Sequence, residues 1–196
     1  HGDVQIAKKC EEIGIDYLAV ATVDEALHLR KNKINLKILL LGIPQFFEIP
    51  DIIKANVECF AFDEEYINQL NTIASQNNTK IGIHLKIDTG MGRLGCNCEN
   101  CVKIASLIAN SSNLELKGVC THFSVSDSLK QEDINYTNHQ IQIFKHCIDN
   151  IKNNGINPGI IHGANSGAVL MYEDAWFDMV RPGIICYGFA PDIEQY

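Results

Sequence analysis

Residues 80–95 read KIGIHLKIDTGMGRLG, an apolar run followed directly by a glycine-rich turn. The run Lys80–Ile87 predicts a strand, and the turn from Gly90 to Gly95 has the pattern G-x-G-x-x-G. A dinucleotide-binding loop of this pattern follows the first strand of its unit and has an acidic residue at the end of the next strand. Here the turn follows the fourth predicted strand, and Glu115 begins a strand. The dinucleotide interpretation is therefore disfavoured, and on the loop alone a purely structural turn is the main alternative.

Similar apolar runs recur along the chain and are separated by segments of helical period. Strands are also predicted at Tyr17–Ala21, Lys37–Leu41, Val57–Ala61, Leu116–Cys120, Gly159–His162 and around Met179–Tyr187. Between them, apolar residues recur every three or four positions, as at Ile141, Phe144 and Ile148. Strands that are apolar on both faces and alternate with helices predict a parallel sheet covered by helices.

Start signals of helices support this alternation. Thr22 with Glu25 predicts a capping box, and Asp63 predicts an N-cap. The fold class is therefore α/β, and the count of seven strands predicts a (β/α)₈ TIM barrel that lacks its first strand. A helical pattern begins almost at once after His1, so we expect the missing strand to precede this helix. We find no internal repeat or linker, and expect residues 1–196 to be one barrel domain.

Composition limits the classes of partner. The net charge of −8 argues against a nucleic-acid surface, since that binding depends on clustered Lys and Arg. The chain shows neither an apolar run of membrane-spanning length nor a signal-peptide pattern. Eight cysteines are scattered, most of them inside apolar runs, which favours reduced thiols and a cytosolic protein.

Polar side chains gather where the later strands end. In chain order these are Arg93, then His122, then His162 with Asn165 and Ser166, and finally Arg181. Each alone is more typical of a structural group. However, barrel enzymes place their chemistry at the carboxyl ends of the strands, and four consecutive ends carry such residues. Two arginines and two histidines without an acidic cluster predict a site for an anion such as phosphate or carboxylate.

Four motifs together resemble a known family. HLKIDTGMGRLG, CTHFSVSD, HGANSGAVL and FDMVRPGIICYGFAP are similar to segments of the pyridoxal-phosphate-dependent alanine racemases, and the resemblance covers essentially the whole chain. It implies a barrel followed by a β-rich domain that is absent here. It also implies a head-to-tail homodimer in the bacterial cytoplasm, acting on alanine. The implied activity is the interconversion of L- and D-alanine, which supplies the D-isomer for peptidoglycan.

The resemblance assigns binding roles to residues of the strand ends. Arg93 would bond the phenolic oxygen of pyridoxal 5'-phosphate and help to hold the substrate carboxylate. Ser166 would bind the cofactor phosphate together with the backbone N–H groups of Gly183 and Ile184.

A second group of residues would surround the cofactor ring. Arg181 would face the pyridine nitrogen, where it can only donate a hydrogen bond because a guanidinium is always protonated. His122 would orient Arg181, and Asn165 and His162 would extend this polar network. Lys86 matches a lysine that is carbamylated in some members, and a carbamate would place a negative charge close to Arg93.

Both catalytic bases of the family would lie outside this chain. The family's Schiff-base lysine belongs to a K-A-N-A-Y-G-H-G segment, whose final His-Gly is similar to His1-Gly2. The second base, a tyrosine, would follow Tyr196. We therefore expect an enzyme in the full-length protein and no activity in this fragment. The alternatives are a serine or broad-specificity amino-acid racemase, and a non-catalytic pyridoxal-phosphate-binding barrel.

The series Cys96, Cys98 and Cys101 is not explained by the resemblance. Three thiols within six residues could join a fourth ligand on zinc or on an iron–sulfur cluster. No second C-x-x-C is present, and we expect reduced thiols and no metal.

Overall fold

The computed structural model describes residues 2–190, which form two compact units. The first holds the chain up to His84 together with Leu107–Glu115, and the second holds Leu85–Ser106 and the chain from Leu116 onward. The chain passes between them inside β4 (Ile81–Asp88), α5 (Cys101–Asn110) and β6 (Leu114–Cys120). Within residues 2–190, none of the helices has the length and hydropathy that a bilayer crossing requires.

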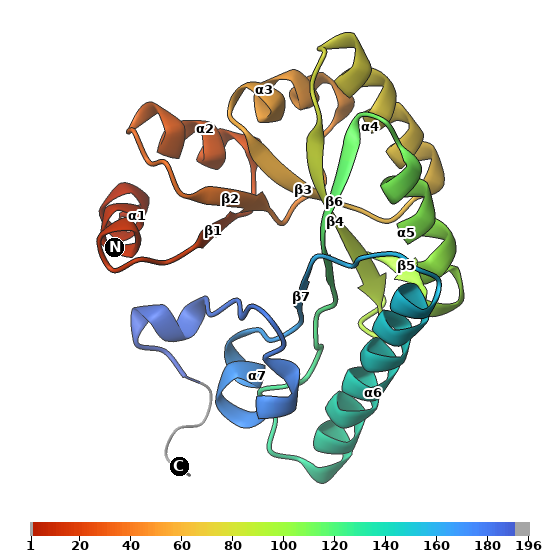
Figure 1. The fold of residues 1–196 in the computed structure, drawn as a ribbon. Coiled ribbons are helices and arrows are strands. Elements are labelled where there is room, and N and C mark those ends of the chain that lie inside the picture. The colour runs from red at the N-terminus through yellow and green to blue at the C-terminus, as the bar shows by residue number, and fades with distance from the viewer. Residues whose placement is uncertain (1, 191–196) are drawn as a thin grey trace. The chain divides into compact units, whose positions relative to one another are not determined.

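The first unit is an alternation of strands and helices. Its elements are α1 (Asp3–Glu12), β1 (Tyr17–Val20), α2 (Val23–Lys31), β2 (Lys37–Leu40), η1 (Phe46–Glu48), α3 (Ile49–Lys54), β3 (Val57–Ala61) and α4 (Glu64–Gln76). The strand order is β1-β2-β3-β4, with β1 parallel to β2 and β2 parallel to β3 (Figure 1). Helix α2 packs on β1 and β2, and α3 packs on β3. The predicted parallel sheet covered by helices is confirmed in this unit.

The expected helix starts are also present. The Thr22 hydroxyl accepts a hydrogen bond from the backbone N–H of Glu25, whose carboxylate accepts one from the backbone N–H of Thr22. The Asp63 carboxylate accepts a hydrogen bond from the backbone N–H of Tyr66. The capping box and the N-cap predicted from the sequence are confirmed.

The second unit contains the ends of β4 and β6. Its further elements are β5 (Cys96–Asn97), η2 (Cys98–Asn100), α6 (Gln131–Asn153), β7 (Ile160–His162), α7 (Ser166–Met171), η3 (Glu173–Ala175) and η4 (Ile184–Tyr187). The strand order is β4-β6-β7, and the short strand β5 pairs in parallel with the end of β4 off this path. Strands β6 and β7 are parallel, and Cys120 lies opposite His162. Because both strands end at the same level, the residues that follow them meet at one edge.

The strand predicted around Met179–Tyr187 is wrong. Met179 forms a single parallel bridge to His162, and the later part of the segment is the short helix η4. Pro182 has no N–H to donate to a ladder, and Gly183 turns the chain with φ −118° and ψ −86°. The apolar residues that suggested a strand therefore leave the sheet.

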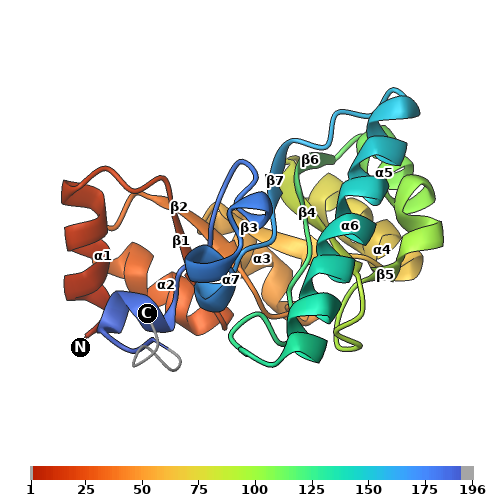
Figure 2. The same ribbon diagram turned by 90° about the horizontal axis from the view of Figure 1, so that it is seen from below.

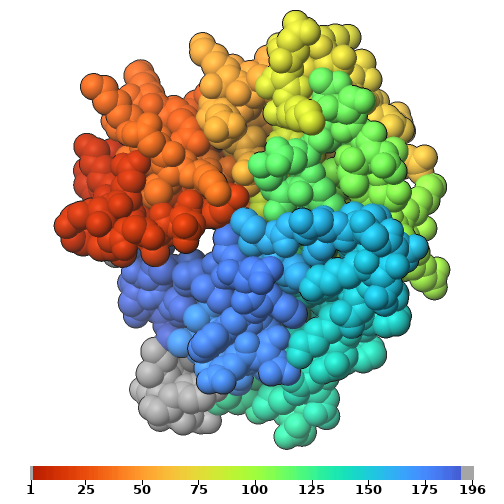
Figure 3. Space-filling view, viewed as in Figure 1, coloured from red at the N-terminus to blue at the C-terminus, as the bar shows by residue number. Residues whose placement is uncertain are grey.

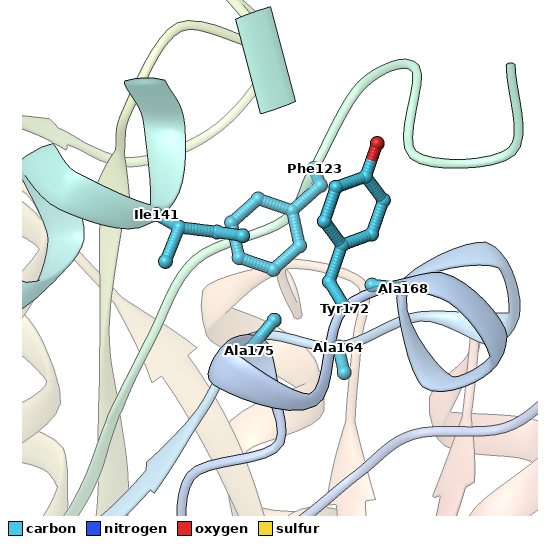
Figure 4. Close-up of a cluster of buried hydrophobic side chains, with 6 residues drawn as sticks. All are labelled: Phe123, Ile141, Ala164, Ala168, Tyr172 and Ala175. Atoms are coloured by element: carbon cyan, nitrogen blue, oxygen red, sulfur yellow. The ribbon is translucent and has the colours of Figure 1, made fainter. Parts of the chain in front are cut away.

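A cluster of buried side chains fixes the loops that follow β6 and β7. Its members are Phe123, Ile141, Ala164, Ala168, Tyr172 and Ala175 (Figure 4). In the space-filling view the atoms of α6 and α7 adjoin (Figure 3). Phe123 is 1% exposed, and burying such a ring contributes roughly 2–3 kcal/mol. Since Phe123 follows His122 and Ala164 precedes Asn165, this packing holds both polar side chains in place.

Candidate active site

The glycine-rich turn after β4 is organised by Asp88. Its carboxylate accepts hydrogen bonds from the backbone N–H groups of Gly90 and Gly92, both at 2.9 Å. Burial raises the pKa of Asp88, but these backbone donors outweigh it and hold the pKa below its ordinary value. The Tyr136 hydroxyl donates to the carbonyl of Gly90 at 2.7 Å. These hydrogen bonds fix the conformation of the turn, in which Arg93 is exposed.

Arg181 is the centre of the hydrogen-bond network at the ends of β6 and β7. Its guanidinium lies 2.6 Å from Nδ1 of His162 and 3.3 Å from Nδ1 of His122. It also donates to the carbonyls of Thr121 at 2.9 Å and Gly163 at 3.2 Å. None of these partners is a carboxylate. The positive charge of Arg181 is thus held in place without being neutralised by them.

The guanidinium fixes the proton positions on the two histidines. Since Arg181 can only donate, Nδ1 of His122 and of His162 must each be an unprotonated acceptor. A neutral ring then carries its proton on Nε2.

The charge state of His122 follows from its surroundings. Burial, and then the cations Arg181, Lys86 and Arg93, lower its pKa from 6.5 to about 4. His122 is consequently neutral near neutral pH.

Lys86 lies among the same positive charges. Its side chain is 6% exposed, and Nζ donates to the carbonyl of Ile87 at 3.3 Å. Burial is the main cause that lowers the pKa of Lys86, and Arg181 and Arg93 lower it further. The positive charges of Lys86, Arg93 and Arg181 thus all influence the surroundings of His122. An anionic group beside them would be stabilised.

A second part of the site is a polar cradle at the start of α7. The Ser166 hydroxyl accepts a hydrogen bond from the backbone N–H of Gly183 at 2.9 Å. Asn165 is the N-cap of the helix, and its Oδ1 accepts from the Ser126 hydroxyl at 2.6 Å and from a backbone N–H of the first turn. A cavity of about 350 Å³ opens beside these groups, and Ile184, 57% exposed, is part of its wall.

A larger hollow lies elsewhere, in the first unit. It has a volume of about 550 Å³ and lies over the start of α4, where acidic and amide side chains line it. None of the predicted site residues is among them. The chemistry-bearing groups favour the smaller cavity of the second unit.

Sequence reasoning missed one member of the network. Gln140 on α6 is fully buried and donates to the Thr89 hydroxyl at 3.3 Å and to the carbonyl of His122 at 3.5 Å. Its Oε1 accepts from both the backbone and the hydroxyl of Ser124 at 3.2 Å. The available signal was a glutamine next to Ile141 on the apolar face of a helix. Gln140 ties the turn after β4 to the loop after β6.

The structure thus brings most of the predicted residues together. Hydrogen bonds link Arg181 with His122 and His162, and Ser166 with Gly183. Lys86 and Arg93 also lower the pKa of His122. No group of three or more His, Cys, Asp or Glu side chains in residues 2–190 is arranged to hold a metal ion. The site therefore combines the cations Lys86, Arg93 and Arg181 with the hydroxyl and amide groups at the start of α7.

Comparison with known proteins identifies the family of the chain. The sequence pattern described as "Alanine racemase, N-terminal domain" matches residues 1–191. The chain belongs to the alanine racemase family. Its α/β fold is that of the TIM-barrel domain of these racemases, in which parallel strands alternate with helices.

Individual racemases match over nearly the whole chain. The alanine racemase of Treponema denticola is 52% identical over 191 residues, which are 97% of this chain and 50% of the relative. A solved structure of alanine racemase from Clostridium difficile 630 has a TM-score of 0.93 at 35% identity, covering 98% of this chain and 53% of that one. An amino-acid racemase of Enterococcus faecalis is 39% identical over 194 residues, 99% of this chain and 27% of the relative. The chain spans about half the length of the curated alanine racemases it matches.

The lowered pKa of His122 predicts that the stability of the chain depends on pH. Below pH 6.5 the unfolded chain takes up a proton at His122, whereas the folded chain resists protonation down to about pH 4. The free energy of unfolding should therefore fall as the pH decreases through this window, by at most roughly 3 kcal/mol from this group. Urea unfolding across the window measures the slope. His122→Gln, which keeps an acceptor for Arg181, should show a shallower slope, and an unchanged slope would contradict the assignment.

Proposed function

We propose that the full-length protein is a pyridoxal-phosphate-dependent alanine racemase that interconverts L- and D-alanine. The observation that carries the proposal is the Arg181 guanidinium, held by two neutral histidines and two carbonyls beside the Ser166 cradle. A fixed cation that donates hydrogen bonds and has no carboxylate among these partners suits a ring nitrogen that must stay unprotonated.

The residues present fit the cofactor. The Ser166 hydroxyl and the backbone N–H groups of Gly183 and Ile184 would bind the phosphate, and the cavity of about 350 Å³ lies beside them. A Cβ at position 183 would lie 3.9 Å from Oγ of Ser166, so residue 183 borders the Ser166 hydroxyl. Preorganised neutral donors of this kind are typical of anion sites.

Arg181 and Arg93 would each donate hydrogen bonds to a different atom of the cofactor ring. When bound, pyridoxal phosphate supplies an electron-withdrawing ring that acidifies the α-proton of an amino acid. Arg181 would donate to the pyridine nitrogen and limit that withdrawal, while His122 and His162 hold the guanidinium in position. Arg93 would bond the phenolic oxygen and the substrate carboxylate. The covalent lysine and the tyrosine base would lie beyond His1 and Tyr196, which themselves are outside the described residues.

We expect residues 1–196 alone to bind the cofactor weakly and reversibly. Without the covalent lysine, borohydride reduction should map the cofactor to no single lysine of this chain. Equilibrium dialysis of Ser166→Ala should show about tenfold weaker binding, corresponding to one lost hydrogen bond of about 1.4 kcal/mol.

Ser111→Ala is the matched control, since the Ser111 hydroxyl donates to the carbonyl of Leu107 in the first unit. It should bind pyridoxal phosphate as the unchanged chain does. Equal affinity of Ser166→Ala and Ser111→Ala would remove Ser166 from the phosphate site. Reduction confined to one lysine within residues 1–196 would contradict the absence of the covalent lysine.

Lys86 is proposed to be carbamylated. Its lowered pKa makes the unprotonated amine available, which adds CO₂ and releases a proton to leave a carbamate. The new negative charge would face Arg93 and Arg181. We expect one carbamate signal in the ¹³C NMR spectrum of protein kept in ¹³C-bicarbonate. The signal should vanish in Lys86→Arg and persist in Lys80→Arg, and a signal that persists in both variants would contradict the proposal.

Several wider properties are proposed with this function. All eight cysteines are free thiols, which supports a reducing compartment, the bacterial cytoplasm, where D-alanine would serve peptidoglycan synthesis. Near the cradle, Ile184 is 57%, Tyr187 41% and Phe189 62% exposed, which supports a head-to-tail homodimer that covers this surface. Residues 1–196 would form one barrel domain, since β4 runs continuously through both units.

A broader amino-acid racemase is the second candidate. The match to the Enterococcus faecalis amino-acid racemase favours it, because that relative shares 39% identity over 194 residues with this chain. Comparing alanine with serine as substrates of the full-length protein distinguishes the two. A non-catalytic pyridoxal-phosphate-binding barrel would racemise neither.

A further inference from the structure

Four of the eight cysteines gather in the second unit. They are Cys96 on β5, Cys98 on η2, Cys101 at the start of α5 and Cys147 on α6, and all are free thiols. In both ribbon views the start of α5 lies beside α6 (Figures 1 and 2). Cys101 and Cys147 are each 1% exposed and Cys96 is 7% exposed, whereas Cys98 is only partly buried. The proposed function makes no use of this thiol cluster.

The thiols are in direct contact. The thiol of Cys101 donates to the carbonyl of Cys147 at 3.9 Å, and the Cys147 side chain is hydrogen-bonded to the sulfurs of Cys101 and Cys98. The bond from Cys147 is the main cause that lowers the pKa of Cys101 to about 7, helped by backbone N–H groups at the start of α5. Burial raises the pKa of Cys98, and raises that of Cys96 to about 12. Cys101 is thus the member of the cluster whose pKa is lowered, while burial raises the pKa of Cys96 and of Cys98.

We propose that Cys98 and Cys101 are a redox-sensitive dithiol, which a peroxide in solution converts into an intrachain disulfide. Cys98 is the partly exposed member, and it is three residues from Cys101 in a C-x-x-C arrangement at the start of a helix, the spacing of catalytic and redox-sensing dithiols. Cys147 acts on Cys101 through its hydrogen bond and does not join the disulfide.

The reaction balances in two steps. Cys98 first loses its proton, its thiolate attacks a peroxide oxygen, and the O–O bond breaks to leave a sulfenic acid and a hydroxide that takes up the proton as water. The Cys101 thiolate then attacks the Cys98 sulfur, the S–S bond forms, and hydroxide leaves and takes up the displaced proton as water. In sum, two thiols and one hydrogen peroxide give one disulfide and two waters.

The disulfide would change the support of the glycine-rich turn. In the reduced protein the Cys98 thiol donates to the carbonyl of Asp88 at 3.4 Å, and Asp88 holds Gly90 and Gly92. A disulfide has no proton to donate, so this link from η2 to the turn is lost on oxidation. The effect on Arg93 rests on the proposed function, whereas formation of the disulfide is independent of it.

Tryptic mapping tests which thiols pair. Cleavage after Arg93 and Lys103 places Cys96, Cys98 and Cys101 on the peptide 94–103, while Cys147 lies on the peptide 146–152. The protein is treated with peroxide, alkylated and digested without reductant. We expect peptide 94–103 to carry one alkyl group and to have two hydrogens fewer than the reduced peptide with one alkyl group. Dithiothreitol before alkylation should restore three alkyl groups. Three alkyl groups on this peptide without dithiothreitol, or a cross-link between the two peptides, would overturn the proposal.

Variants identify the partners inside peptide 94–103. Cys98→Ser and Cys101→Ala should each abolish the disulfide, while Cys96→Ser and the exposed Cys186→Ser should form it as the unchanged protein does. A disulfide that persists in Cys101→Ala would overturn the pairing. Cys147→Ala should slow its formation roughly tenfold at neutral pH and shift the pH profile upward, since Cys101 loses the bond that favours its thiolate. An unshifted profile would overturn the role given to Cys147.

Discussion

Arg181→Glu in the full-length protein is expected to lower alanine racemisation by more than tenfold and to weaken cofactor binding. The carboxylate would replace the donor that we assign to the pyridine nitrogen, and an opposite charge there would raise the pKa of that nitrogen. A cofactor whose ring withdraws electrons more strongly would favour transamination as a side reaction, in which water is consumed, pyruvate is released and the amino group of alanine stays on the cofactor. The new carboxylate would also lie near the carbonyls of Thr121 and Gly163, which now accept from Arg181.

Two effects of this change need to be separated. Racemisation rate, cofactor affinity and pyruvate formation should be measured on one preparation. Arg181→Lys is the matched variant, because it keeps the charge but loses the planar fork that reaches both histidines. If racemisation and affinity both stay within about twofold in Arg181→Glu, which is about 0.4 kcal/mol, Arg181 does not face the ring nitrogen.

Gly95→Ala is expected to lower the free energy of unfolding by roughly 3 kcal/mol or more. Gly95 has φ +134°, and a Cβ there would lie 2.5 Å from the backbone nitrogen of Asp88. Both the backbone conformation and the overlap with β4 oppose a side chain. Since Asp88 also holds the turn that carries Arg93, the variant should disturb that turn.

Gly92→Ala is the matched control within the same turn. Gly92 has φ +71°, and a Cβ there meets nothing within 4 Å, so only the left-handed conformation opposes alanine. Its cost should be about 1 kcal/mol. Urea unfolding of both variants gives the difference, and equal losses of stability would show that the close approach of Gly95 to β4 has no energetic weight.

The sequence predicted the parts of the fold that follow from local patterns. Apolar runs such as Lys37–Leu41 and Val57–Ala61 became β2 and β3, because strands apolar on both faces need a buried parallel sheet. The caps at Thr22 and Asp63 were predictable because each joins residues only three positions apart. The segment Met179–Tyr187 was not, because Pro182 and the turn at Gly183 outweigh its β-favouring composition.

The candidate site was predictable where it depends on strand ends. The register that places Cys120 opposite His162 brings the loops after β6 and β7 to one edge, so His122 and His162 meet Arg181. Gln140 was not predictable, since its partners come from two segments that are distant in sequence, the turn after β4 and the loop after β6. The thiol cluster likewise depends on α6, which brings Cys147 to the C-x-x-C segment.

The central claim is tested most directly by the racemase activity of the full-length protein. Purified protein with added pyridoxal phosphate should be incubated with L-alanine and with D-alanine, and the enantiomers should be separated over time. We predict that both reactions reach the same mixture of isomers, and that residues 1–196 alone give no conversion. A folded, pyridoxal-phosphate-bound full-length protein that leaves both enantiomers unchanged would contradict the account.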